Sequence, residues 1–411
     1  MKTYQFDKTR ALMERATKVI PCGVYGHFGP APYVPLEHYP FFAERASGSK
    51  FWDVDGNEYI DYMCAYGPMV LGYAHPKVDE AYRKQMEKAD IASLASERMV
   101  ELAELLVELI PVADWAFFAK NGADVTNYAV MIARAATGRK KIIAIQGGYH
   151  GTAPWMQAVG HHGAIEEDHD HVVRIPWNDL DALSQVISEH VGEIAAMIAT
   201  PYHHPIFTDN VIPNEGYWAQ VQEILKREGI LLISDDVRCG FRLHLGGSNE
   251  KYGFKPDLVC FSKAIANGYA LSSLVGAEPL KRVAASVFHS GSFWYCAGSL
   301  AAAIACIEEM KQIDAPAVLE QKGRKLLEGM VQLADTHGLN LKVSGEPAMP
   351  YLRITDDPSL TQHQRFCGEC TRRGAYFTSH HNWFVSMAHS DADIQRTLDI
   401  VDEGLKVVVE G

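Results

Sequence analysis

Two apolar runs in the middle of the chain each end at a residue that can do chemistry. The run 230–233 is followed by Asp235, and the run 258–261 is followed, after one serine, by Lys263. Short apolar runs with charged ends predict buried strands whose ends form a site at one edge of a sheet. A desolvated lysine there has a lowered pKa and attacks aldehydes, while a carboxylate keeps a pyridine nitrogen protonated. An internal ion pair between the two residues is the structural alternative.

Two turns earlier in the chain add further parts. One turn reads Lys-Asn-Gly-Ala-Asp between an apolar strand and a helix, so Gly122 and Ala123 lie at a helix N-terminus, which suits a phosphate. The other turn reads Gly-Gly-Tyr-His-Gly, and its Tyr149 is placed to lay a ring on a flat cofactor. Each turn alone is also typical of a simple cap or loop. Their order along the chain with Asp235 and Lys263 predicts a site for pyridoxal phosphate.

The elements that must position these residues alternate between strand and helix from about residue 112. The candidate strands are short and apolar: 115–119, 141–146, 172–175, 195–199, 230–234, 257–261 and 273–277. The candidate helices between them are 124–137, 179–190 and 214–228. This alternation predicts an α/β fold with a mostly parallel, seven-stranded sheet covered on both faces. We expect a large domain at residues 63–300, and a smaller α+β domain that combines residues 1–62 with residues 301–411.

Composition narrows the class of protein. The chain has 411 residues, of which 47% are hydrophobic, and a formal net charge of −13. This charge argues against a general nucleic-acid or anionic-membrane binder, and no stretch approaches the roughly 20 apolar residues of a membrane span. The polar N-terminal segment lacks a secretory hydrophobic region, which predicts a cytoplasmic protein. Cys367 and Cys370 are interpreted as small residues of a helix rather than a redox or zinc pair.

Several stretches resemble one known family. They cover nearly the whole chain and include residues 52–61, 71–76, 133–139, 148–151, 235–237, 240–242 and 262–263. With these stretches the chain resembles the class III (subgroup II) pyridoxal-phosphate aminotransferases, on the branch of glutamate-1-semialdehyde 2,1-aminomutase. The resemblance implies the fold called type I among pyridoxal-phosphate enzymes.

The resemblance also implies roles for the residues around the cofactor ring. Lys263 forms the Schiff base with pyridoxal 5'-phosphate and then moves a proton between the substrate carbon and the cofactor. Asp235 pairs with the pyridine nitrogen, and Val237 and Tyr149 lie on the two faces of the ring. Asp236 stands where the family usually has Glu, and its implied role is to support the residues that contact the cofactor rather than to contact the cofactor itself.

Two further roles concern the phosphate and the neighbouring subunit. The backbone amides of Gly122 and Ala123 hold the phosphate. A neighbouring subunit usually supplies a threonine hydroxyl to that phosphate, and Ser292 is the candidate in this chain. The resemblance therefore implies a homodimer with shared active sites.

Departures from the aminomutase pattern concern the substrate. The branch has an Arg soon after an early Pro-Gly-Gly-Val, whereas residues 21–30 contain none, and its Glu-Pro is Thr200-Pro201 here. We therefore expect an aminotransferase that moves an amino group from an amino donor to an aldehyde, ketone or oxo-acid acceptor. The alternatives are an aminomutase or another pyridoxal-phosphate isomerase, epimerase or decarboxylase, and a binding protein that keeps the fold without catalysis.

Candidate substrate contacts are cationic or imidazole side chains near the expected site, each of which is also readily explained as a loop residue. They are His27, His150, Arg238, His203 and His204. The histidines between residues 161 and 171 are interpreted as part of a solvated loop, so no metal site is expected.

Overall fold

The computed structural model describes residues 1–24 and 29–410, which separate into two units. The first, here called the terminal unit, comprises Met1–His75, Ile206–Asn210 and Ala317–Gly411. The second, here called the sheet unit, comprises Pro76–Pro205 and Val211–Pro316. The units therefore divide at residues 75 and 316, whereas the domain boundaries expected from the sequence are 62 and 300.

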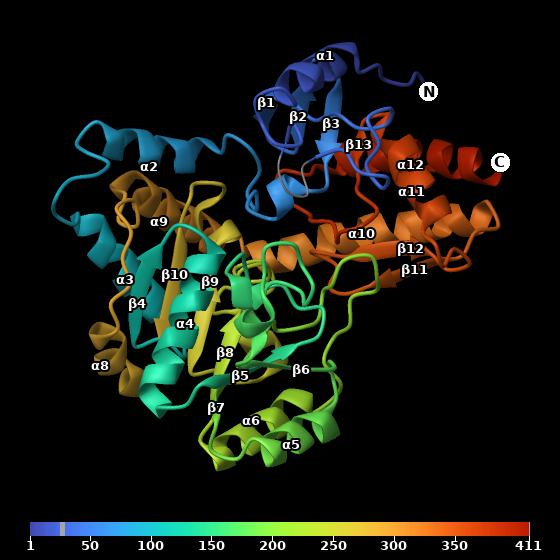
Figure 1. Cartoon of the computed structure of the whole chain (residues 1–411). Coiled ribbons are helices and arrows are strands. Elements are labelled where there is room, and N and C mark those ends of the chain that lie inside the picture. Colours follow the sequence, from blue (N-terminus) through green and yellow to red (C-terminus); the bar gives the residue numbers. More distant parts are fainter. Residues whose placement is uncertain (25–28, 411) are drawn as a thin grey trace. The chain divides into compact units, whose positions relative to one another are not determined.

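The sheet unit is built on seven strands. In spatial order they are β4 (Trp115–Ala119), β10 (Ser272–Gly276), β9 (Leu258–Phe261), β8 (Leu231–Asp235), β7 (Ile194–Ala199), β5 (Lys141–Ile145) and β6 (Val172–Ile175). Strand β10 is antiparallel to both of its neighbours, and all other neighbouring pairs are parallel. The predicted α/β fold with a mostly parallel seven-stranded sheet is confirmed (Figure 1).

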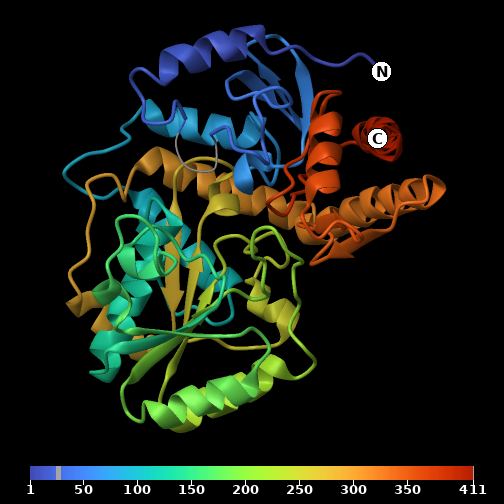
Figure 2. The same ribbon diagram turned by 45° about the vertical axis from the view of Figure 1, so that its right-hand side comes forward.

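Helices cover both faces of this sheet. On one face, Ile142 and Ala144 of β5 pack into a core with α4 (Gly122–Thr137) and α8 (Glu278–Ser286). On the other face, Ile143 and Ile145 pack into a second core with α5 (Leu180–Glu189) and α6 (Tyr217–Glu228), which lie side by side in Figures 1 and 2. Successive residues of one strand thus enter different cores, which explains why the strands are continuous apolar runs.

The remaining helical elements of the sheet unit flank these layers. The α-helices are α2 (Pro76–Met86), α3 (Glu97–Leu109), α7 (Ser248–Tyr252) and α9 (Ala297–Gln312). The short 3-10 helices are η3 (Pro154–Met156), η4 (Glu166–His169) and η5 (Lys263–Ala266). Helix α9 packs against both α2 and α3.

The terminal unit mixes small sheets with helices. One sheet has the order β1 (Ala43–Ser47), β2 (Lys50–Asp53), β3 (Glu58–Asp61) and β13 (Ala375–Tyr376), and β11 (Leu341–Ser344) pairs with β12 (Tyr351–Ile354). The helical elements are α1 (Asp7–Ala16), η2 (Cys64–Tyr66), α11 (Thr361–Thr371) and α12 (Asp391–Val409), with most of α10 (Ala315–Thr336). Gly56, at φ 87°, closes the predicted hairpin between β2 and β3.

All eight cysteines are free thiols. Cys367 and Cys370 are buried on α11, which agrees with their interpretation as packed helical residues. No helix in the described ranges is both long and apolar enough to cross a membrane.

Candidate active site

The carboxyl ends of β8 and β9 bring Asp235 and Lys263 to one edge of the sheet. The two strands are parallel neighbours, and Asp235 is in register with Cys260, three residues before Lys263. The Lys263 backbone has φ 50°, in the left-handed region that residues other than glycine rarely adopt. Such strain persists where the surrounding structure enforces it, and it is common at functional sites.

The Asp235 carboxylate is held from two directions. Its Oδ2 lies 2.7 Å from Nδ1 of His150, and its Oδ1 accepts a hydrogen bond of 3.2 Å from the backbone N–H of Val237. Asp235 and His150 are both buried. Because an ionised carboxylate only accepts hydrogen bonds, the imidazole donates from Nδ1. These two hydrogen bonds fix the position of the carboxylate.

His150 therefore has a position that the sequence did not indicate. The sequence counts it among candidate substrate contacts, whereas the structure places it in a hydrogen bond with Asp235. The hydroxyl of Thr126 donates to its carbonyl oxygen at 2.7 Å. The position of His150 beside Tyr149 predicted only that it lies in a loop near the cofactor. The hydrogen bond to Asp235, 85 positions away, could not be predicted from that position.

The first turn of α4 is packed so closely that its small residues are required. A Cβ atom on Gly122 would lie 2.9 Å from Cγ1 of Val237. A Cβ atom on Gly151 would lie 2.6 Å from Cβ of Ala123. The N–H groups of a first helical turn have no acceptor within the helix, and the helix dipole is positive there. The backbone N–H groups of Gly122 and Ala123, at the N-terminus of α4, thus form a place that attracts anions.

Tyr149 and Val237 lie around the same carboxylate. Tyr149 is 61% exposed, which leaves its ring accessible, and it interacts electrostatically with Asp235 and Arg238. Val237 contacts Gly122 and donates its N–H to Asp235, as described above. We call the set Gly122, Ala123, Tyr149, Asp235, Val237 and Lys263 the strand-end site.

The environment of Lys263 brings its titration close to physiological pH, so that a substantial fraction of the side chain is a neutral amine. Burial, with the neighbouring Arg238 guanidinium as the second cause, lowers the pKa of Lys263 from 10.5 to about 7, against the opposing effect of Asp235. A neutral amine is nucleophilic toward aldehydes and can accept a proton.

Three other candidate substrate contacts lie at the ends of β7 and β8. The Arg238 guanidinium donates from Nη1 to the carbonyl oxygen of His204 at 3.0 Å. Burial lowers the pKa of His203 to about 4 and that of His204 well below its ordinary value, so both imidazoles are neutral. His203 is stacked on Trp177, with 5.9 Å between ring centroids. His27 lies outside the described residues.

Comparison with known proteins identifies the family. The family model described as aminotransferase class-III matches residues 33–404. The chain belongs to the class-III aminotransferases. It is 38% identical over 402 residues to an aminopentol aminotransferase of Sphingopyxis macrogoltabida, covering 98% of this chain and 94% of that protein. It is 34% identical over 406 residues to a 3-aminobutyryl-CoA aminotransferase of Cloacimonas acidaminovorans, covering 98% of this chain and 97% of that protein.

A solved structure supports the same assignment. The FumI protein of Sphingopyxis sp. MTA144, in its form with pyridoxal phosphate as internal aldimine, superposes with a TM-score of 0.94 at 37% identity, covering 98% of this chain and 97% of that one. A glutamate-1-semialdehyde 2,1-aminomutase of Methanosarcina acetivorans is 30% identical, covering 97% of this chain and 98% of that protein. The predictions of a pyridoxal-phosphate-dependent aminotransferase and of its family are confirmed, and the aminomutases are more distant relatives.

The aminotransferase's strand-end site fits pyridoxal 5'-phosphate. Gly122 has no room for a side chain, so the backbone at the start of α4 stays open for the phosphate. The fixed carboxylate of Asp235 matches a protonated ring nitrogen, and the neutral amine of Lys263 matches the cofactor aldehyde. In the ranges the structure covers, no three His, Cys, Asp or Glu side chains are grouped as metal ligands.

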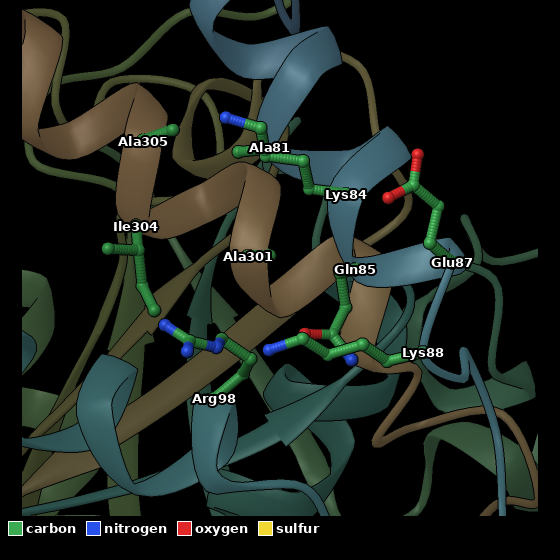
Figure 3. A pocket seen from close by; sticks show the side chains of 9 residues that line it. All are labelled: Ala81, Lys84, Gln85, Glu87, Lys88, Arg98, Ala301, Ile304 and Ala305. Carbon is green, nitrogen blue, oxygen red and sulfur yellow. The ribbon is translucent and has the colours of Figure 1, made fainter.

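A separate cavity of about 520 Å³ lies between α2, α3 and α9 (Figure 3). Its charged lining includes Lys84, Lys88 and Arg98. Lys84 lies 3.4 Å from Glu80, and Arg98 is paired with Glu101. No residue of the strand-end site lines this space, which we call the helix cavity.

Proposed function

We propose that Lys263 is the residue of this aminotransferase that binds the aldehyde of the cofactor and transfers the proton during amino-group exchange. Asp235 is proposed to hold the ring nitrogen. The observation that carries this assignment is the pairing of a fixed, buried carboxylate with a lysine whose pKa is about 7, on neighbouring strand ends. A lysine with a pKa near neutrality exists partly as the neutral amine at physiological pH, which is the form that its role requires.

The cofactor, when bound, supplies an electron-withdrawing ring that stabilises negative charge at the substrate carbon. Asp235, whose carboxylate is held in place by His150 and the Val237 N–H, would face the ring nitrogen and hold its proton there. The backbone amides of Gly122 and Ala123 bind the phosphate. Tyr149 and Val237 would hold the two faces of the ring. Lys263 accepts and returns the proton at Nζ.

The substrates of the aminotransferase are an amine and an oxo compound. One relative is named for 3-aminobutyryl-CoA, in which the amino group lies on the third carbon. We propose that this chain likewise accepts donors whose amino group is not on the carbon next to a carboxyl group. A panel of paired donors with the amino group on the second or third carbon tests this proposal. Faster cofactor amination by the second-carbon donors throughout the panel would contradict it.

A homodimer is the proposed assembly, with Ser292 supplying its hydroxyl to the cofactor phosphate of the partner. Ser292 is exposed, and it lies between Phe288 and Phe293, which are 87% and 65% exposed. Exposed aromatic side chains close together in a loop are typical of an interface. Ser292→Ala is expected to weaken cofactor binding about tenfold, since one hydrogen bond to an anion is lost. Unchanged cofactor affinity, or a monomer by sedimentation, would rule out this role.

We also propose a cytoplasmic location. Its support is that all eight cysteines are free thiols, as expected in a reducing compartment. Fractionation of the native host with an antibody tests it, and recovery of the protein outside the cytoplasm would overturn it.

The test of the overall function follows the visible absorbance of the purified protein. Addition of an amino donor is expected to remove the absorbance of the lysine-linked cofactor, and addition of an oxo acceptor is expected to restore it. Sustained turnover must require both compounds, since the cofactor carries the amino group between them. Turnover of a single compound without any acceptor would instead indicate an aminomutase, an epimerase or a decarboxylase.

A further inference from the structure

Three neighbouring strand ends bring a fixed cation to the edge of the sheet where Lys263 lies. Strands β7, β8 and β9 are parallel and adjacent, and they continue into His204, Arg238 and Lys263. Asp235 of β8 is in register with Cys260 of β9. Arg238 comes three residues after Asp235, and Lys263 comes three residues after Cys260. The two cationic residues therefore follow the carboxyl ends of neighbouring parallel strands, at the same edge of the sheet.

The Arg238 guanidinium is anchored on the neighbouring strand end. Its Nη1 donates to the His204 carbonyl oxygen at 3.0 Å, at the end of the strand on the other side of β8. A guanidinium remains charged at any physiological pH, even where burial lowers its pKa, as it does here. Arg238 also interacts electrostatically with Asp235 and Tyr149, so its charge acts on two residues of the strand-end site besides Lys263.

The permanent charge of Arg238 reconciles opposite requirements of Asp235 and Lys263. Asp235 must be ionised to hold a protonated ring nitrogen, but a carboxylate beside a lysine also stabilises the ammonium form. An ammonium group can neither attack an aldehyde nor accept a proton. The guanidinium of Arg238 repels the ammonium form and so acts against Asp235.

The other groups around Lys263 have weaker influence. Arg242 acts in the same direction as Arg238 but is a smaller contributor. Burial raises the pKa of the Cys239 thiol well above its ordinary value, and burial lowers that of His204, so both are neutral. Among the charged groups that act on Lys263, Arg238 is the largest contributor.

We propose that Arg238 is a positioning residue that offsets the charge of Asp235 at Lys263 and thereby keeps the lysine amine neutral and reactive. This inference rests on the proposed role of Lys263. The competing explanation is a purely structural one, in which Arg238 only ties the end of β8 to the end of β7 through the His204 carbonyl.

The test measures the titration of Lys263 in the full chain. An amino donor first converts the cofactor to its amino form, which releases the lysine. Brief pulses of an amine-acylating reagent are then applied from acid to alkaline pH, and mass spectrometry follows the peptide that contains Lys263. For the wild type we expect a midpoint near neutrality. Arg238→Gln and Arg238→Met are expected to raise the midpoint by roughly 1 unit or more, and Arg238→Lys to leave it nearly unchanged.

The matched control is Arg139→Gln in the same unit. Arg139 also donates to backbone carbonyls, those of Ile194, Glu228 and Gly229, but it is not among the charges that act on Lys263. It should leave the Lys263 midpoint where it is in the wild type. A shift in this control equal to that of Arg238→Gln would indicate a structural effect and overturn the proposal.

The remaining outcomes separate this inference from the proposed function. A folded Arg238→Gln or Arg238→Met variant with the wild-type midpoint overturns the role of Arg238 alone. Should neither neutral variant fold, a wild-type midpoint in the ordinary lysine range overturns the proposal, while a midpoint near neutrality that Arg238→Lys preserves supports it. Retention of the visible cofactor absorbance in Lys263→Ala would instead refute the assignment of Lys263 itself.

Discussion

The strand-end site and the helix cavity differ in how their charges are held. In the strand-end site, Asp235 is buried and fixed by hydrogen bonds, and the pKa of Lys263 is about 7. In the helix cavity, Lys84 and Arg98 are paired with acidic residues near the solvent. The helix cavity has a volume of about 520 Å³, yet no residue of the strand-end site lines it. Burial and coupling of charges, rather than open volume, are therefore the basis on which we propose the strand-end site as the active site.

The physical reason is the screening of charge by water. A pair of exposed charges contributes about 0–1 kcal/mol, because solvent competes for both partners. A buried pair cannot be screened in this way, so it shifts the protonation of each member strongly. Substitutions of buried charged or hydrogen-bonded residues are therefore expected to have larger effects than substitutions in the helix cavity.

The largest effect is expected for Lys263→Ala. This substitution removes both the amine that binds the cofactor and the proton acceptor, so kcat should fall by about 10³-fold or more. Steady-state transamination measures the loss. The control is Lys88→Ala in the helix cavity, and a comparable loss in that variant would break the comparison.

Asp235→Asn comes next, with an expected decrease in kcat of roughly 10²-fold or more. The amide has the shape of the carboxylate but no charge, so the ring nitrogen loses its proton. The visible spectrum of the bound cofactor should change together with the rate. If Asp235→Asn keeps at least half of the wild-type rate, the carboxylate does not hold the ring.

His150→Phe should lower kcat by about 10- to 100-fold, since a hydrogen bond to a charged group contributes roughly 1.5–3 kcal/mol. His150→Asn is the matched variant, because its amide N–H can replace the donor that faces Asp235. The ratio of the two rates measures the hydrogen bond separately from the packing. Equal losses in both variants would show that the imidazole only fills space.

Asp236 provides a prediction about stability. Burial raises the pKa of its carboxyl group from 3.8 to about 7. The folded state therefore favours the protonated form, and this contribution to stability is present below pH 4 and is lost as the pH rises through 7. Thermal unfolding should show a wild-type Tm that decreases between pH 5 and 8 relative to that of Asp236→Asn. Parallel pH curves for the two proteins would contradict the shift.

The smallest effect is expected in the helix cavity. Arg98→Gln removes a guanidinium that is paired with Glu101, and Lys88→Ala removes an exposed ammonium. Both variants should keep kcat within about twofold and the free energy of unfolding within about 0.5 kcal/mol. A larger loss of turnover in either variant would show that this cavity takes part in catalysis.

Much of the sheet unit was predictable because its strands are buried on both faces. Such strands are continuous apolar runs, and their charged ends stand out in the sequence, as Asp235 and Lys263 do. The bounds of every strand agree with the predictions or differ from them by a single residue. The turn before α4 was recognisable because close packing against Val237 requires glycine at position 122.

What the sequence did not reveal depends on contacts between distant segments. The hydrogen bond from His150 to Asp235 joins a loop residue to the last residue of β8, 85 positions away, and no local pattern encodes it. The anchoring of Arg238 on the His204 carbonyl is likewise a product of strand order. The short segment Ile206–Asn210 belongs to the terminal unit although both of its flanks belong to the sheet unit. Its salt bridge from Asp209 to Arg353 explains this membership.

The most direct test of the account identifies the lysine that carries the cofactor. The purified protein is treated with borohydride, which fixes the bond between cofactor and lysine, and the labelled peptide is sequenced by mass spectrometry. We predict that the pyridoxyl group is attached to Lys263 and that Lys84 and Lys88 of the helix cavity are unlabelled. Stoichiometric labelling of any lysine other than Lys263 would contradict it.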